Sequence, residues 1–125
     1  MDARLAARML AGGRLSVGLA LVIAPRRILD RWVGRELSRR PAVQALARAM
    51  GARDLVMGMI AMHTLDHPQV GPRWQLTCGA VDLTDAVATV AARGDLPLTG
   101  ALGVGTLAGG SALVEALLWR ALRHG

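Results

Sequence analysis

Residues 74–92 read WQLTCGAVDLTDAVATVAA, nineteen residues that form an apolar segment of membrane-spanning length interrupted by Asp82 and Asp85. Helical spacing places the two carboxylates on one face, in line with Cys78 and Thr89. A carboxylate at the centre of a membrane-spanning helix costs about 2.5–3.5 kcal/mol on an insertion scale, so such a group normally faces protein. The segment therefore predicts neighbouring helices that shield both aspartates from lipid.

The composition of the chain is also typical of membrane helices. The chain has 125 residues, which predicts one membrane domain over residues 1–125. Hydrophobic residues make up 53% of it, yet Phe and Tyr are absent and 15 residues are Gly. Packing through small residues rather than aromatic rings is common between membrane helices.

The positive charge gathers beside an apolar segment. All fifteen basic residues are Arg, the net charge is +6, and six of the arginines fall within residues 26–40. This distribution predicts contact with lipid headgroups at a plasma membrane. It does not predict nucleic-acid binding, because no aromatic stacking platform accompanies the charge. Besides the lipid bilayer, we expect a second copy of the chain or another membrane protein as partner.

Four apolar segments predict an all-α, up-down four-helix transmembrane bundle. The expected long helices cover residues 4–24, 41–65, 74–92 and 96–114, of which 49–65 is the crossing part of the second. Residues 26–37 predict a short helix between the first two, either interfacial with Trp32 as its anchor or a surface connection. Three of the four segments are marginal in hydropathy, so a soluble or peripheral helical bundle is the alternative.

The fourth segment carries the clearest membrane signal. Residues 96–114 contain no charge, and Gly105 and Gly109 form a GxxxG pair that predicts a close-packing face. Arginines on the first and third connections outnumber those on the termini and the middle connection by seven to five. The Arg-rich loop 26–40 is therefore expected in the cytoplasm, with both termini outside.

Six ionisable residues fall within the predicted spans: Arg14, Arg53, Asp54, Asp82, Asp85 and Glu115. Left unpaired, they would cost about 18 kcal/mol, at about 3 kcal/mol each, which exceeds the whole stability of a typical domain. Depth along the helices pairs Arg53 with Asp85. The same reasoning pairs Arg14 with Asp82 or Glu115. We therefore predict an intramembrane charge network formed by these six residues.

The network does not balance, since two arginines face four carboxylates. Either Arg8 or Arg48 reaches into it, or one or two carboxylates stay protonated in the buried site. A neutral carboxyl inside a membrane suits a proton relay or coupled transporter, and equally an inert polar clasp between helices.

No catalytic, cofactor-binding or metal-ligating set is expected, so the sequence does not predict an enzyme. His63, Asp66 and His67 have ligand-like spacing, but polar residues beside a turn explain them. Cys78 is the sole cysteine, which excludes an internal disulfide, and it is expected to be a small buried side chain.

Gly51, Ala52, Arg53 and Asp54, followed by Gly58, resemble part of the small bacterial four-helix integral membrane proteins of the DoxX-like group and related uncharacterised families. Trp74, Asp82 and Asp85 extend the resemblance over most of the chain. It implies a plasma-membrane four-helix bundle, and some DoxX-type proteins belong to quinone-dependent redox systems. No residue here matches a quinone or thiosulfate site, so only the fold is implied.

These observations predict a small multi-pass protein of the cell envelope with a structural or accessory role. The first alternative is a proton-coupled small transporter or channel-like oligomer that uses Asp82, Asp85 and Glu115. The second is a membrane subunit of a redox system.

Overall fold

The computed structural model describes residues 2–124, of which 86% are helical and none lies in a strand. Six helices follow one another: α1 (Ala3–Ile23), α2 (Pro25–Trp32), α3 (Arg35–Ser38), α4 (Pro41–Thr64), α5 (Val70–Ala91) and α6 (Leu98–His124). The all-helical fold class predicted from the sequence is confirmed.

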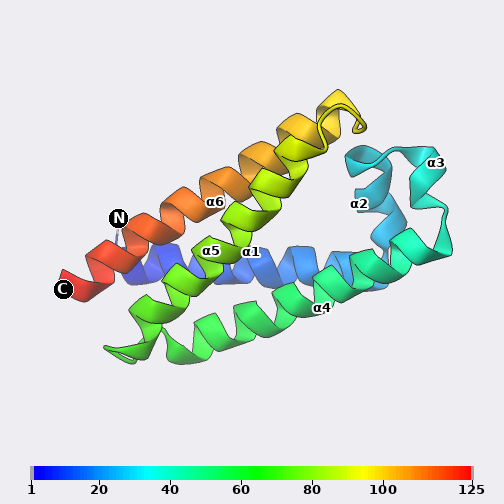
Figure 1. Ribbon diagram of the computed structural model, residues 1–125. Coiled ribbons are helices and arrows are strands. Elements are labelled where there is room, and N and C mark those ends of the chain that lie inside the picture. The colour runs from blue at the N-terminus through cyan, green and yellow to red at the C-terminus, as the bar shows by residue number, and fades with distance from the viewer. Residues whose placement is uncertain (1, 125) are drawn as a thin grey trace.

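The four long helices form two closely packed pairs. α1 packs against α4 and α5 against α6, and contacts within each pair are far more extensive than contacts between the pairs. Both ends of the chain lie at one end of the molecule, together with the turn from α4 to α5 (Figure 1). The short helices α2 and α3 and the turn from α5 to α6 lie at the other end.

Glycines let α1 and α4 approach until their backbones touch. A Cβ atom on Gly18 would lie 2.7 Å from the carbonyl oxygen of Gly51, and one on Gly51 would lie 2.6 Å from that of Gly18. Farther along, a Cβ atom on Gly58 would lie 2.8 Å from Cγ of Leu15. Because any side chain would separate the two helices, glycine is required at these contacts.

The GxxxG pair of α6 does not perform the same role within the chain. A Cβ atom on Gly105 would meet nothing within 4 Å, and one on Gly109 would reach only Cβ of Ala86, at 4.0 Å. The prediction that Gly105 and Gly109 form a close-packing face is therefore wrong for contacts between helices of this chain. A GxxxG motif marks a face that can pack closely, but it does not specify the partner.

Two short helices replace the single one expected over residues 26–37. Gly34 separates them with a φ of +89°, a backbone conformation that glycine adopts readily. The apolar side of α2 packs inward, where Leu29 forms a cluster with Leu21 and Ala47. Trp32 packs against the same cluster and is half-buried, and whether the helix is interfacial or a surface connection stays a prediction.

α5 and α6 are both longer than predicted. α5 begins at Val70, and Pro72 is accommodated because the first turn of a helix needs no backbone N–H donors. The Nδ1 atom of His67 accepts a hydrogen bond from the Val70 backbone N–H at 3.2 Å and thereby caps this helix. α6 continues without a break to His124.

Two of the described helices, α1 and α6, are long and apolar enough to cross a membrane. Their most apolar 18-residue windows have mean hydropathies of 1.5 and 1.6. Only 22% and 11% of these windows are buried inside the molecule, whereas the core helix of a water-soluble protein is mostly buried. The two helices are therefore compatible with a membrane protein.

We expect Gly51→Ala to lower the free energy of unfolding by about 1–3 kcal/mol, because the added methyl group must separate α1 from α4. Gly105→Ala is the matched control, because its methyl group meets open space and alanine favours a helix by up to about 1 kcal/mol over glycine. Unfolding in mixed detergent micelles measures both. A Gly51→Ala variant as stable as Gly105→Ala would contradict this packing.

Candidate functional site

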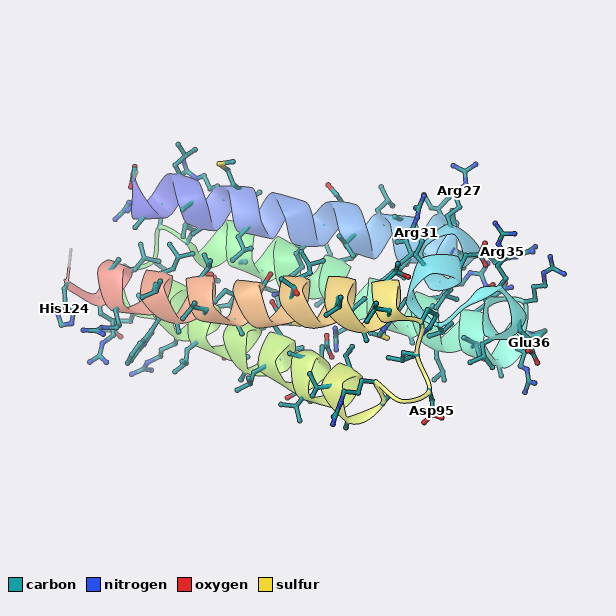
Figure 2. The ribbon with its side chains drawn as sticks, turned by 90° about the horizontal axis from the view of Figure 1, so that it is seen from above. Arg27, Arg31, Arg35, Glu36, Asp95 and His124 are labelled. Carbon is teal, nitrogen blue, oxygen red and sulfur yellow. The ribbon has the colours of Figure 1, made fainter. Side chains whose placement is uncertain are left out.

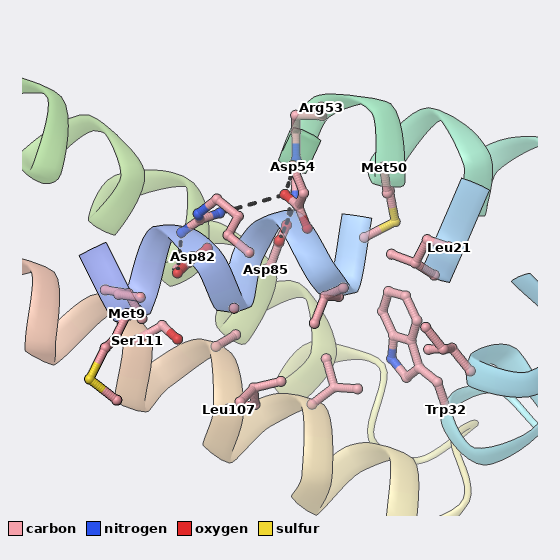
Figure 3. A pocket seen from close by; sticks show the side chains of 17 residues that line it. Met9, Leu21, Trp32, Met50, Arg53, Asp54, Asp82, Asp85, Leu107 and Ser111 are labelled. Carbon is pink, nitrogen blue, oxygen red and sulfur yellow. Dashed lines mark hydrogen bonds and ion pairs between the residues drawn. The ribbon is translucent and has the colours of Figure 1, made fainter. Parts of the chain in front are cut away.

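The six ionisable residues that the sequence places within the long helices meet in the interior. Arg14 comes from α1, Arg53 and Asp54 from α4, Asp82 and Asp85 from α5, and Glu115 from α6. Four of them are labelled in Figure 3, where Arg53 and Asp54 of α4 and Asp82 and Asp85 of α5 point toward one another beside α1. The structure thus brings one cluster together from all four long helices.

Arg14 is the centre of the cluster. Its Nη2 atom donates hydrogen bonds to Oδ2 of Asp82 at 2.7 Å and to Oε1 of Glu115 at 2.9 Å. Its Nη1 atom lies 3.5 Å from Oδ1 of Asp54. The Arg14 side chain is only 8% exposed. A single guanidinium therefore contacts carboxylates from three other helices.

Arg53 forms the second half of the cluster. Its Nη2 and Nη1 atoms donate to the two oxygens of Asp85 at 2.7 and 3.2 Å, the two-pronged geometry that favours arginine over lysine. Nη2 also donates to Oδ1 of Asp54 at 3.1 Å. Asp54 consequently contacts both arginines and joins the halves into one network.

These contacts include the pairs that helical depth predicts, Arg53 with Asp85 and Arg14 with Asp82 and Glu115. Sequence reasoning placed Asp54 in the network but missed that it bridges the arginines. The contact of Asp54 with Arg53 follows from their being neighbours in sequence. Its contact with Arg14 depends on how closely α1 packs on α4, and the sequence does not give this distance between helices.

Neither of the extra arginines considered from the sequence enters the network. The Nη2 atom of Arg8 pairs with Asp66 at 3.3 Å, where both side chains are more than half exposed. The Nε atom of Arg48 donates to the Val22 carbonyl oxygen at 3.2 Å. Two arginines therefore still face four carboxylates.

The unmatched charge coincides with an unmatched oxygen. Oε2 of Glu115 has no hydrogen-bond partner among the described residues. The residue is only 1% exposed, so the oxygen is also shielded from solvent. A buried polar oxygen without a partner costs about 1–3 kcal/mol, more when it is charged. Glu115 is thus the least satisfied member of the network.

A cavity of about 290 Å³ lies beside the network and opens between the two helix pairs. Arg14, Arg53 and the three aspartates line it on one side. Trp32 of α2 and apolar side chains such as Leu21 and Leu107 line the rest (Figure 3). No residue pattern in the sequence predicted this cavity, since it results from the way the helix pairs diverge.

The remaining polar residues of the sequence analysis have separate roles. Asp66 pairs with Arg4 and Arg8, while His63 contacts the Met59 carbonyl oxygen and His67 caps α5. Among residues 2–124, no three His, Cys, Asp or Glu side chains are arranged so that they could hold a metal ion. Cys78 is buried and free.

Comparison with known proteins adds no assignment: no family model, curated protein or solved structure matches this chain. The resemblance to the DoxX-like group stays a prediction. The reasoning about this site therefore depends on its own geometry.

We expect Arg14→Met to lower the free energy of unfolding by about 3–5 kcal/mol, because it leaves buried carboxylates without their counter-charge. Arg8→Met is the control on the same helix, and its exposed pair should contribute less than about 1 kcal/mol. Adding Asp82→Asn and Glu115→Gln to Arg14→Met should recover part of the loss. Equal effects of Arg14→Met and Arg8→Met in a detergent unfolding assay would show that the network is not stabilising.

Proposed function

We propose that the chain is a small multi-pass membrane protein of the cell envelope, in which α1, α4, α5 and α6 cross the bilayer as an up-down bundle. In this proposal the charge network holds the helices together, and the role of the protein is structural or accessory. The observation that carries the proposal is the inverted distribution of polarity between interior and surface.

α5 illustrates this inversion. Its buried residues include four polar or sulfur-containing side chains: Gln75, Cys78, Asp82 and Thr89. Its exposed side includes four large apolar side chains: Leu76, Leu83, Val87 and Val90. Water would favour the opposite arrangement, whereas lipid favours this one, because apolar surface is at no disadvantage there and ions must face protein.

The lengths of the helices support crossing by all four. They contain 21, 24, 22 and 27 residues, or about 31–41 Å at 1.5 Å per residue. A bilayer core is about 30 Å thick. α4 and α5 have lower hydropathy because of Arg53, Asp54, Asp82 and Asp85, and the network satisfies those charges inside the protein.

The charges at the two ends support an orientation. Arg27, Arg31 and Arg35 surround α2 and α3 at the end opposite the termini (Figure 2). Arginine-rich loops remain on the cytoplasmic side. We therefore place α2 and α3 in the cytoplasm and both termini outside the plasma membrane.

Labelling of single cysteines tests this topology. In a Cys78→Ser background, a membrane-impermeant maleimide added to intact cells should label Gln69→Cys and His124→Cys. Glu36→Cys and Gly94→Cys should be labelled only after permeabilisation. If α1 and α6 alone crossed the membrane, Gln69→Cys would behave like Glu36→Cys, and this outcome would overturn the four-span proposal.

A proton-linked function is the second candidate, and the buried Oε2 atom of Glu115 favours it. An unpartnered carboxylate oxygen beside an excess of carboxylates is a place where a proton can be held and released. Glu115 and Asp82 compete for the same Nη2 atom of Arg14. Protonation of either carboxylate would therefore strengthen the ion pair between Arg14 and the other carboxylate.

Proteoliposomes with an imposed pH gradient test this second candidate. Wild type is expected to carry a proton flux above that of empty vesicles, and Glu115→Gln should reduce it at least tenfold while its helix content and unfolding midpoint are retained. Asp66→Asn, which alters an exposed carboxylate, is the control. Absence of flux in the wild type would eliminate this candidate and leave the structural role in place.

A further inference from the structure

The cavity beside the network combines apolar walls with a charged side. Its volume of about 290 Å³ is just below the range for small-molecule sites, about 300–1,000 Å³, and so suits only a compact ligand. Apolar side chains from α1, α2 and α6 form most of the wall, including Val17, Ile28 and Val104. Such walls favour a compact apolar group and disfavour a hydrated inorganic ion.

The charged side of the cavity is acidic. Three aspartates and two arginines line it, which gives a formal charge of −1 when all five are ionised. Both arginines are engaged, since each has a carboxylate oxygen 2.7 Å from its Nη2 atom. An added anion would have to displace one of these pairs. An added cation would compensate the excess, and at Asp85 it would share the carboxylate with Arg53, because each carboxylate oxygen has a second lone pair. Asp85 is the most accessible of the carboxylates, with 23% of its side chain exposed.

An aromatic ring lines the same cavity at the α2 end. Trp32 is half-buried, and its indole projects into the space enclosed by α1, α2 and α6 (Figure 3). Its position is fixed on two sides, because α2 packs against Leu21 and Ala47 and its backbone contacts Gly100 of α6. Tryptophan is the side chain that binds cations most strongly through its ring face.

We propose that this cavity binds an amphiphilic organic cation, a single-ring or short-chain ammonium whose positive group lies between Asp85 and Trp32. The apolar part of the ligand would occupy the wall between α1 and α6. The proposal rests on the four-helix membrane bundle proposed above, but not on its orientation in the membrane, its structural role or proton transport.

Equilibrium dialysis of the purified protein in a non-ionic detergent tests the proposal, with benzyltrimethylammonium as the probe. Two ligands of similar shape serve as comparisons: neopentylbenzene, which replaces the charged nitrogen with carbon, and phenylmethanesulfonate, which is an anion. Detergent-only samples correct for uptake by micelles. The cation should bind saturably, one per chain, and about tenfold or more tightly than either comparison ligand. Equal binding of neopentylbenzene would identify an acyl-chain site instead and overturn the proposal.

Variants locate the site. Asp85→Asn should weaken binding of the cation about tenfold or more, and Trp32→Leu about threefold or more. Asp66→Asn and Trp119→Leu remove the same chemical groups outside the cavity and should bind as wild type does. If Asp85→Asn fails to fold by circular dichroism, Trp32→Leu decides the question. Wild-type affinity in Trp32→Leu, or equal losses in the controls, would contradict the assignment, whereas the maleimide labelling of Gln69→Cys tests the bundle independently.

Discussion

The contact of the Arg14 guanidinium with carboxylates from three other helices is the interaction on which the rest of the structure depends. The two helix pairs contact each other far less than the helices within each pair do. The ion pairs from Arg14 to Asp82 and Glu115 cross between the pairs, as does the fork from Arg53 to Asp85. Once buried, these groups can satisfy their charge only through one another. Charge therefore holds α5 and α6 on α1 and α4, together with the small apolar cluster of Ala7, Leu65 and Leu118.

Small residues make this network geometrically accessible. Gly18 and Gly51 allow α1 and α4 to touch, and this contact brings Arg14 within reach of Asp54. Gly79 has a similar role in the other pair, where an added Cβ atom would lie 3.3 Å from Cβ of Glu115. Close backbone packing and ionic pairing are therefore coupled, because a helix pushed outward by one methyl group would also lengthen its ion pairs.

Much of the fold follows from the sequence, because segment length and interruption by Pro are local properties. Pro41 does begin α4, and charges inside apolar segments did indicate the cluster. The sequence does not predict which helices pack against each other. For that reason the GxxxG pair at Gly105 was assigned a packing role that belongs to Gly18 and Gly51 on other helices. The same limitation hid the bridging position of Asp54 and the cavity, both of which arise from the spacing between helices.

A network that only holds the helices together explains most of its six charged residues, though not all. Asp82 with Arg14 and Asp85 with Arg53 would already be two balanced pairs, and Asp54 joins them. Asp54 and Glu115 are the two carboxylates in excess, but Asp54 contacts both arginines. Glu115 shares Arg14 with Asp82, and one of its oxygens has no hydrogen-bond partner among the described residues. In a low-dielectric interior this arrangement is more costly than an apolar residue of similar size. A purely structural requirement does not favour Glu115, so this residue gives the strongest reason to look for a function beyond holding the helices together.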